Sequence, residues 1–159
     1  MYCRRCLSVV VNSDLRFENG YSVIHENLGD SFSLKVEVRK SALPSAGLGL
    51  FAKQRLSKAE VVCDYRGKVY TLSEALALTD KDYLMGFGFN VHICAKAELT
   101  CFGRYVNDPR DSSKVNCCVV KLKRLKVAFF RALRDIEIGE EIFIDYGQSY
   151  WKIRESKYS

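Results

Sequence analysis

The stretch Gly139-Glu-Glu-Ile-Phe-Ile-Asp-Tyr-Gly-Gln-Ser-Tyr-Trp151 carries the densest pattern in the chain. Glu141 to Asp145 is an apolar run between two acidic residues and predicts a short β-strand. The second half gathers Tyr146, Tyr150 and Trp151 around Gly147, where glycine permits a sharp turn. Tyr146 therefore stands at a junction. It is either an aromatic strand residue or a phenol placed to meet a substrate.

Outward from this stretch, the sequence predicts a mainly β chain. Short strands are expected at 32–38, at 60–65, at 68–70, and on both sides of a turn near 123–126 within 119–133. The segment 83–89 contains two glycines and is expected to be a strand or a bent segment. The best helical segment is 71–78, because Thr71 and Glu74 have the spacing of a capping box. The sum is a β-rich domain with one or two short helices.

The composition fits one domain of ordinary size. Of the 159 residues, 48% are hydrophobic and 28% are charged, so the chain can build a core. No apolar run approaches the roughly 18 residues that span a bilayer, and the first residues lack the pattern of a signal peptide. The net charge of +6 suits either a nucleic-acid or chromatin partner or simple solubility. The basic run near 121–126 is likewise either a solvated face or a binding patch.

Seven cysteines, an odd number, predict reduced thiols rather than disulfides. Cys3 and Cys6 have the spacing of half a zinc site, but the sequence contains no second such pair. Either no zinc binds here, or the pair belongs to a larger zinc module. His25 and His92 are isolated and are expected to be surface or packing residues. The sequence therefore predicts no complete metal site.

Two stretches carry residues suited to ligand binding. Gly47 and Gly49 precede an apolar run and would let a ligand approach the backbone amides, although a plain turn explains them as well. Within 101–110, Arg104 could hold a carboxylate, and the amide of Asn107 can both donate and accept hydrogen bonds. A loop closed by the turn at 107–109 is the alternative interpretation.

Together these stretches resemble the SET-domain family of protein lysine methyltransferases. The resemblance covers residues 36–151 and runs in order through SAGLGLFA (45–52), VVCDYRGKV (61–69), DYLMGFGF (82–89), GRYVND (103–108) with Asn116-Cys117, and RDIEIGEEIFIDYG (134–147). It implies a mainly β SET-domain fold of several small sheets with a C-terminal pseudoknot. It also implies an N-terminal extension at 1–35, a SET domain at 36–148 and a C-terminal flank at 149–159.

The resemblance implies a role for each residue that matches a family motif. Tyr146 and Tyr65 would be catalytic: Tyr146 would orient the amine, and Tyr65 would line the lysine channel. Ile144, Phe143 and Tyr150 would also line the substrate channel. S-adenosylmethionine would be bound by a set drawn from all the motifs: Gly47, Leu48, Gly49, Tyr83, Arg104, Tyr105, Asn107 and Trp151.

The chain departs from the family pattern at several positions. Asp108 stands where the family has His, and the interval from Arg104 to Asn116 looks more like that of the PR subclass. No Cys-rich tail follows Tyr146, so the zinc cluster of many relatives is not expected. Tyr150 and Trp151 are expected to close the lysine channel instead. Ile144 stands where a Tyr or Phe often limits the number of methyl groups, so higher methylation states are expected.

The resemblance implies an enzyme that transfers a methyl group from S-adenosylmethionine to a lysine of a protein. A histone is the expected substrate, and nucleic-acid or nucleosome contact through the basic surface is expected with it. The expected location is the nucleus, and the alternatives are the cytoplasm or the chromatin of another cell. No membrane association is expected. The alternative is a catalytically weak relative that binds a peptide or nucleic acid, which the altered loop around Asp108 keeps open. A basic interaction domain with coincidental motifs is the third interpretation, and binding of the cofactor separates the first two.

Overall fold

The computed structural model of the protein describes residues 16–18, 21–23, 32–123 and 126–155, so Cys3 and Cys6 lie outside the described residues. The described elements, in chain order, are β1 (Arg16–Glu18), β2 (Tyr21–Val23), β3 (Val36–Lys40), β4 (Leu48–Ala52), β5 (Val61–Tyr65), β6 (Lys68–Tyr70), α3 (Leu72–Ala77), β7 (Leu84–Gly86), β8 (His92–Cys94), a 3-10 helix (Phe102–Tyr105), β9 (Cys117–Leu122), β10 (Val127–Ala132) and α4 (Gln148–Glu155). Short strands dominate, which confirms the predicted mainly β class.

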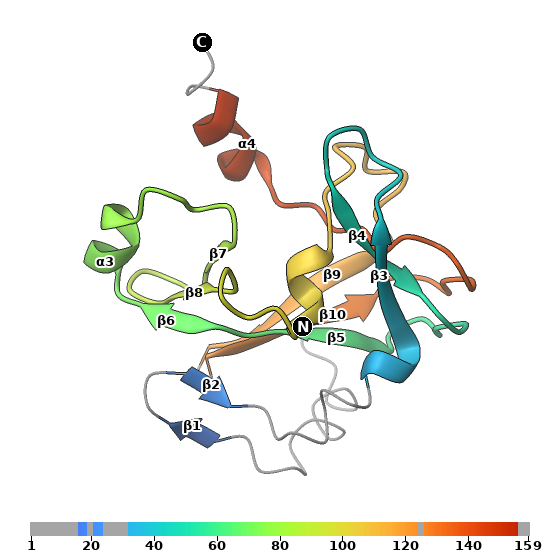
Figure 1. The fold of residues 1–159 in the computed structure, drawn as a ribbon, viewed down its shortest axis with the longest axis horizontal. Helices are drawn as coiled ribbons and strands as arrows, with labels where there is room; N and C mark the ends of the chain where they lie inside the picture. The colour runs from blue at the N-terminus through green and yellow to red at the C-terminus, as the bar shows by residue number, and fades with distance from the viewer. Residues whose placement is uncertain (1–15, 19–20, 24–31, 124–125, 156–159) are drawn as a thin grey trace.

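The strands form three small antiparallel sheets (Figure 1). The central sheet has the order β5-β10-β9. On one side of it lies the hairpin of β3 and β4, and on the other side lies the five-stranded sheet β1-β2-β6-β8-β7 with α3. The N-terminal strands belong to this last sheet, because Tyr21 of β2 pairs with Lys68 of β6. This is the arrangement of several small sheets that the resemblance implied.

Two predictions that rest on local sequence chemistry are confirmed. β9 and β10 pair from Cys117↔Ala132 to Leu122↔Val127, which are the two strands expected within 119–133. α3 begins after Thr71, whose side chain accepts a hydrogen bond from the Glu74 backbone N–H, while the Glu74 side chain accepts one from the Thr71 N–H. In the part of the chain that the structure describes, no helix is long and apolar enough to cross a membrane.

The strand predicted at 32–38 is wrong in its first half. Residues 32–35 form one helical turn, and β3 begins only at Val36. A strand would have turned Phe32, Leu34 and Val36 to one face. Instead Phe32 and Val36 are buried and Leu34 is 71% exposed. Because positions i and i+4 share a face of a helix, one helical turn buries Phe32 and Val36 and leaves Leu34 exposed.

The segment 141–145 is extended but is not the continuous strand that the sequence predicted. Glu141 bridges Phe51 on one side, and Phe143 bridges Asn107 on the other. The Ile144 N–H donates to the Asn107 carbonyl at 3.0 Å. The N–H groups of residues 116 and 117 donate to the Phe143 carbonyl at 3.2 and 2.9 Å. The segment is therefore held by both ends of the loop 107–116, which is the pseudoknot arrangement.

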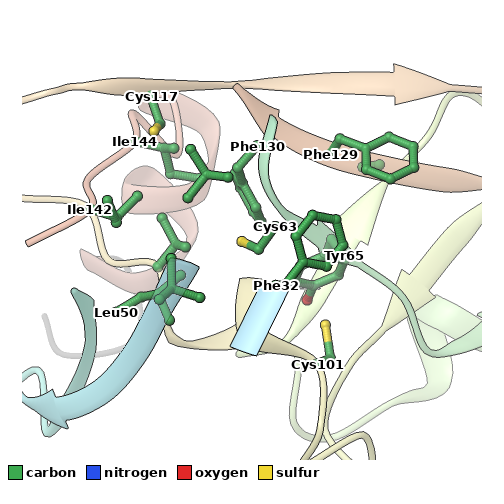
Figure 2. Close-up of a cluster of buried hydrophobic side chains, with 14 of the residues drawn as sticks. Phe32, Leu50, Cys63, Tyr65, Cys101, Cys117, Phe129, Phe130, Ile142 and Ile144 are labelled. Atoms are coloured by element: carbon green, nitrogen blue, oxygen red, sulfur yellow. The ribbon is translucent and has the colours of Figure 1, made fainter. Parts of the chain in front are cut away.

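The core lies where the central sheet meets β4 and the segment 142–144. Figure 2 shows side chains from these elements in one cluster, including Leu50, Cys63, Phe130 and Ile142. Each of these four is at most 1% exposed. Cys63 packs there as a small apolar group, in line with the prediction of reduced thiols. The five cysteines among the described residues, at positions 63, 94, 101, 117 and 118, are all free.

Candidate active site

A cavity of about 1850 Å³ opens beside the pseudoknot. Its wall includes the turn before β4, the segment before β7, the 3-10 helix, β9 and β10, and α4 at the top of Figure 1. Most residues proposed from the sequence line it: Gly47, Leu48, Tyr65, Tyr83, Arg104, Tyr105, Asn107, Ile144, Tyr146, Tyr150 and Trp151. Gly49 and Phe143 do not line it.

Tyr146 presents its phenol to this cavity in a fixed orientation. Its hydroxyl donates to the Val106 carbonyl at 2.7 Å, so the proton is directed to the backbone and the oxygen remains an acceptor. Burial is the main cause that raises the pKa of Tyr146, and Tyr150 and Asp108 add to it. The phenol is therefore neutral at physiological pH. Tyr146 is therefore not part of a strand: it follows the extended segment and lines the cavity.

Tyr65 repeats this geometry at the end of β5. Its hydroxyl donates to the Tyr83 carbonyl at 2.5 Å, and its ring meets Phe130 edge-on at 6.2 Å between centroids. Burial, with smaller contributions that include Tyr146, raises the pKa of Tyr65 well above its usual range. Both phenols line the same cavity. Both are neutral, and both hydroxyl protons are used by backbone carbonyls.

Arg104 is held between two aromatic rings and keeps unused donors. Its guanidinium carbon lies 4.5 Å from the centroid of Tyr83 and 5.3 Å from that of Tyr105. Its Nε and Nη1 are buried and have no hydrogen-bond partner within the described part of the chain. Buried charged donors are costly unless paired, so this guanidinium is suited to an anionic group of a ligand.

Gly47, just before β4, and Gly49, within β4, are glycine for different structural reasons. Gly47 has φ +71°, which favours glycine, and a Cβ there would meet no atom within 4 Å. Its backbone is therefore open to the cavity. Gly49 is closed off, because a Cβ there would collide with the Glu141 carboxylate. Asn107 joins these parts, since its side-chain amide donates to the Leu48 carbonyl at 2.9 Å.

Ile144 and Phe143 face different surroundings. Ile144 is only 4% exposed; it lines the cavity and also belongs to the core cluster of Figure 2. The Phe143 N–H donates to the Asn116 side-chain oxygen at 2.8 Å. Of the two residues, only Ile144 is placed to limit the size of a group in the cavity.

α4 brings Tyr150 and Trp151 against the ring of Tyr146. The Tyr146 and Tyr150 centroids are 4.6 Å apart in an edge-on contact, and Trp151 stacks on Tyr146 at 6.2 Å with an interplanar angle of 17°. The other end of the helix is held to the segment before β7 by an ion pair from Arg154 to Asp82 at 2.5 Å. α4 therefore forms a wall of the cavity, and closure of a lysine channel by Tyr150 and Trp151 stays a prediction.

Comparison with known proteins gives this site a family. The model of the SET domain matches residues 47–147, which is more than half of the chain and includes the pseudoknot and both phenols. The chain belongs to the SET-domain family. It is also similar to a histone-lysine N-methyltransferase EZH2 of Chaetomium thermophilum, with 24% identity over 152 residues. That similarity covers 84% of this chain and 10% of the relative, so the chain spans about a tenth of the relative's length.

Both similarities support a protein lysine methyltransferase family for this SET domain. The described residues contain no candidate metal site, that is, no group of three or more His, Cys, Asp or Glu side chains that could hold a metal ion. The half zinc site proposed for Cys3 and Cys6 is not tested by this, because both residues precede the described part.

Three polar residues that hold this SET domain together received no role from the sequence. Glu141 is 5% exposed and accepts hydrogen bonds from Ser41 Oγ at 2.6 Å and from the Ala42 N–H at 2.9 Å. Asn116, fully buried, bonds the backbone of residues 141 and 143. Asp108 accepts hydrogen bonds from the backbone N–H of Tyr146 and from the indole N–H of Trp151. The sequence offered one signal for such residues, namely a polar residue beside an apolar run. Where a residue of this kind is buried, it is expected to be hydrogen-bonded.

Proposed function

We propose that this SET domain transfers a methyl group from S-adenosylmethionine to the side-chain amine of a lysine in a protein, and that the protein is a histone. The observation that carries the proposal is the pair of neutral phenols, Tyr65 and Tyr146, in one cavity with Arg104, whose Nε and Nη1 have no hydrogen-bond partner among the described residues. Each phenol donates its proton to a backbone carbonyl, so each oxygen can accept from a substrate.

The residues around the cavity fit the proposed cofactor. Arg104 offers buried donors for a carboxylate, and the open backbone at Gly47 allows close approach of a ligand. Tyr83, Tyr105 and Trp151 supply aromatic surface to the same wall. The cofactor would bring a methyl group on a positively charged sulfur. Leu48 and Asn107 would contribute to its binding site, since both line the cavity and share a hydrogen bond.

The two phenols are proposed to prepare the lysine amine. A free lysine has a pKa near 10.4 and attacks only when neutral, and burial in an apolar channel lowers that pKa. Tyr146 would accept a hydrogen bond from the amine and stabilise positive charge on the methyl group through its oxygen lone pairs. Tyr65 would line the channel on the opposite side. Alignment of this kind can contribute on the order of 7–11 kcal/mol to the lowering of the barrier.

The substrate channel would be bounded by Ile144 and Tyr150. Ile144 has no hydroxyl with which to hold a water molecule, and we propose that it leaves room for more than one methyl group. Tyr150 and Trp151 pack against the ring of Tyr146 and would keep water from the reacting atoms. Phe143 supports the channel from behind, because its backbone fixes the position of Ile144.

A histone substrate implies a nuclear site of action, and we propose that location. The relative from Chaetomium thermophilum is named as a histone-lysine methyltransferase, which supports the choice of substrate. The net charge of +6 suits additional contact with nucleic acid in a nucleosome. We also propose that the SET domain extends from 36 to 148, with flanking segments at 1–35 and 149–159.

Calorimetric titration with S-adenosylmethionine, followed by transfer from a labelled cofactor to a panel of histones, tests the proposal. The expected result is saturable binding by the parent chain and label on a lysine. Arg104→Ala is expected to weaken cofactor binding by about tenfold or more, because it removes a charge-assisted hydrogen bond. Absence of binding by the folded parent chain would favour the binding-module alternative.

A further inference from the structure

The carboxylate of Asp108 accepts three hydrogen bonds. Its Oδ2 accepts from the backbone N–H of Tyr146 at 2.9 Å and from the indole N–H of Trp151 at 2.8 Å. Its Oδ1 accepts from the backbone N–H of Arg110 at 2.7 Å. Asp108 is only 9% exposed, so these bonds are shielded from water. A single carboxylate oxygen therefore joins the backbone of the proposed catalytic tyrosine to the helix that walls the cavity.

The two groups that share this oxygen also touch each other. The ring of Trp151 stacks on the ring of Tyr146, and the guanidinium carbon of Arg110 lies 4.5 Å from the Trp151 ring centroid. Trp151 and Tyr146 both line the cavity. The position of Tyr146 relative to α4 is thus set from both sides, by the stacked ring and by the shared oxygen.

An uncharged side chain of the same shape cannot replace the carboxylate. Asp108 receives three N–H donors on two oxygens, and hydrogen bonds to an ionised acceptor are about twice as strong as neutral ones. Asparagine has one oxygen and an NH2 group, so at least one N–H would face another donor. The change Asp108→Asn should therefore release either Arg110 or the pair Tyr146 and Trp151.

We infer that Asp108 is a positioning residue that fixes the phenol of Tyr146 and the indole of Trp151 at the cavity through one shared carboxylate oxygen. The expected effect on kcat rests on the proposed methyl transfer. The hydrogen bonds of Asp108 do not depend on that proposal. α4 has a second attachment, the ion pair between Arg154 and Asp82, so loss of the Asp108 contact is expected to change its local position rather than to release the whole helix.

The only tryptophan in the chain reports on this contact directly. Because Trp151 is the sole tryptophan, fluorescence excited beyond the absorption band of tyrosine comes from the residue that Asp108 holds. In Asp108→Asn we expect a shift of the emission maximum and stronger quenching by acrylamide, with unchanged far-ultraviolet circular dichroism. Asp111→Asn is the matched control, because the Asp111 side chain accepts hydrogen bonds from Ser113 and pairs with Lys114 rather than with Trp151 or Tyr146. That variant should emit like the parent.

The kinetic measurement separates positioning from general stability. In Asp108→Asn, kcat for methyl transfer should fall by about tenfold or more at saturating cofactor. The variant should still be folded under the assay conditions, so that unfolding does not explain the loss of kcat. Asp108→Glu keeps the charge and should recover part of both kcat and emission. Parent values of kcat and emission in Asp108→Asn would overturn the inference.

A measurement on the parent chain keeps the test valid if Asp108→Asn does not fold. The indole N–H of Trp151 and the backbone N–H of Tyr146 should exchange slowly with deuterium in nuclear magnetic resonance spectra. Exchange of both at the rate of exposed amides would overturn the inference. A parent chain with protected amides but no methyl transfer would instead refute the proposed function, so the two failures are distinguishable.

Discussion

The carboxylate of Glu141 occupies the space beside Gly49 that any larger residue would need. A Cβ at Gly49 would overlap Glu141 Oε1 and would lie 3.2 Å from the Cβ of Ser41. The same Oε1 accepts the hydroxyl of Ser41 at 2.6 Å, and it lies 3.4 Å from the Asn107 amide nitrogen, which donates to it. The C-terminal motif and the first glycine motif are therefore adjacent parts of one packed contact.

Gly49→Ala should destabilise the protein through this contact. The added methyl group would displace a buried, hydrogen-bonded carboxylate, and such overpacking costs about 1–3 kcal/mol. The free energy of unfolding, measured with guanidinium chloride, should fall by that amount. In a Glu141→Ala background the same change should cost much less, because the colliding oxygen is gone. Equal costs in the two backgrounds would show that Gly49 and Glu141 are not in contact.

Asn116→Ala should weaken the pseudoknot. Asn116 Nδ2 donates to the Glu141 carbonyl at 2.7 Å, and its Oδ1 accepts from the Phe143 N–H at 2.8 Å. Truncation leaves two buried backbone groups unsatisfied, at a cost of about 2–5 kcal/mol in the free energy of unfolding. Asn90→Ala is the control, because that side chain bonds the Leu72 N–H in an exposed position. If the two variants unfold at the same denaturant concentration, the pseudoknot does not depend on Asn116.

The stability of the protein should fall as the pH rises above about 10. Burial raises the pKa of Tyr146 and of Tyr65 in the folded state, so the unfolded chain loses these protons first. The stability that the neutral phenols provide is thus complete below pH 10 and declines above it. Tyr146→Phe should reduce the slope by up to about 1.4 kcal/mol per pH unit. Denaturant titrations from pH 8 to 11 measure this, and parallel slopes for both proteins would contradict the assignment.

Ile144 should set the number of methyl groups on the product. It lines the cavity, whereas Ile142, two residues earlier, is fully buried in the core and does not line it. The parent chain should form di- or trimethyllysine, and Ile144→Phe should shift the product toward monomethyllysine because it fills the channel. Ile142→Val should leave the product distribution unchanged. Mass spectrometry of the product decides this, and monomethylation alone by the parent at long times would count against the role of Ile144.

Local chemistry in the sequence predicted those parts of the fold that depend on near neighbours. The capping box of Thr71 and Glu74 spans three residues, and β9 and β10 are joined by a short turn. The turn at 32–35 was missed, because Phe32 and Val36 satisfy helical and strand spacing equally well and the surrounding core decides between them. Propensity alone cannot weigh that tertiary contribution.

The candidate site residues were named through motifs, and the hydrogen bonds that connect them were not predicted. The resemblance named Tyr65, Tyr146 and Arg104, and the structure brings all three to one cavity. The bonds that hold them join residues far apart in the chain: Asp108 and Tyr146 are separated by 38 positions, and Ser41 and Glu141 by 100. Hydrogen-bond partners at such separations follow from the pseudoknot, so no pattern within one stretch of sequence could have indicated them.

Methyl transfer by Tyr146→Phe, compared with the parent chain, tests the central claim most directly. The variant keeps the aromatic ring that stacks on Trp151 and loses only the hydroxyl that donates to Val106. With labelled S-adenosylmethionine and histones, the parent should label lysine, and the variant should bind the cofactor with similar affinity while its transfer rate falls by about 100-fold or more. Transfer by Tyr146→Phe at the parent rate would contradict the account.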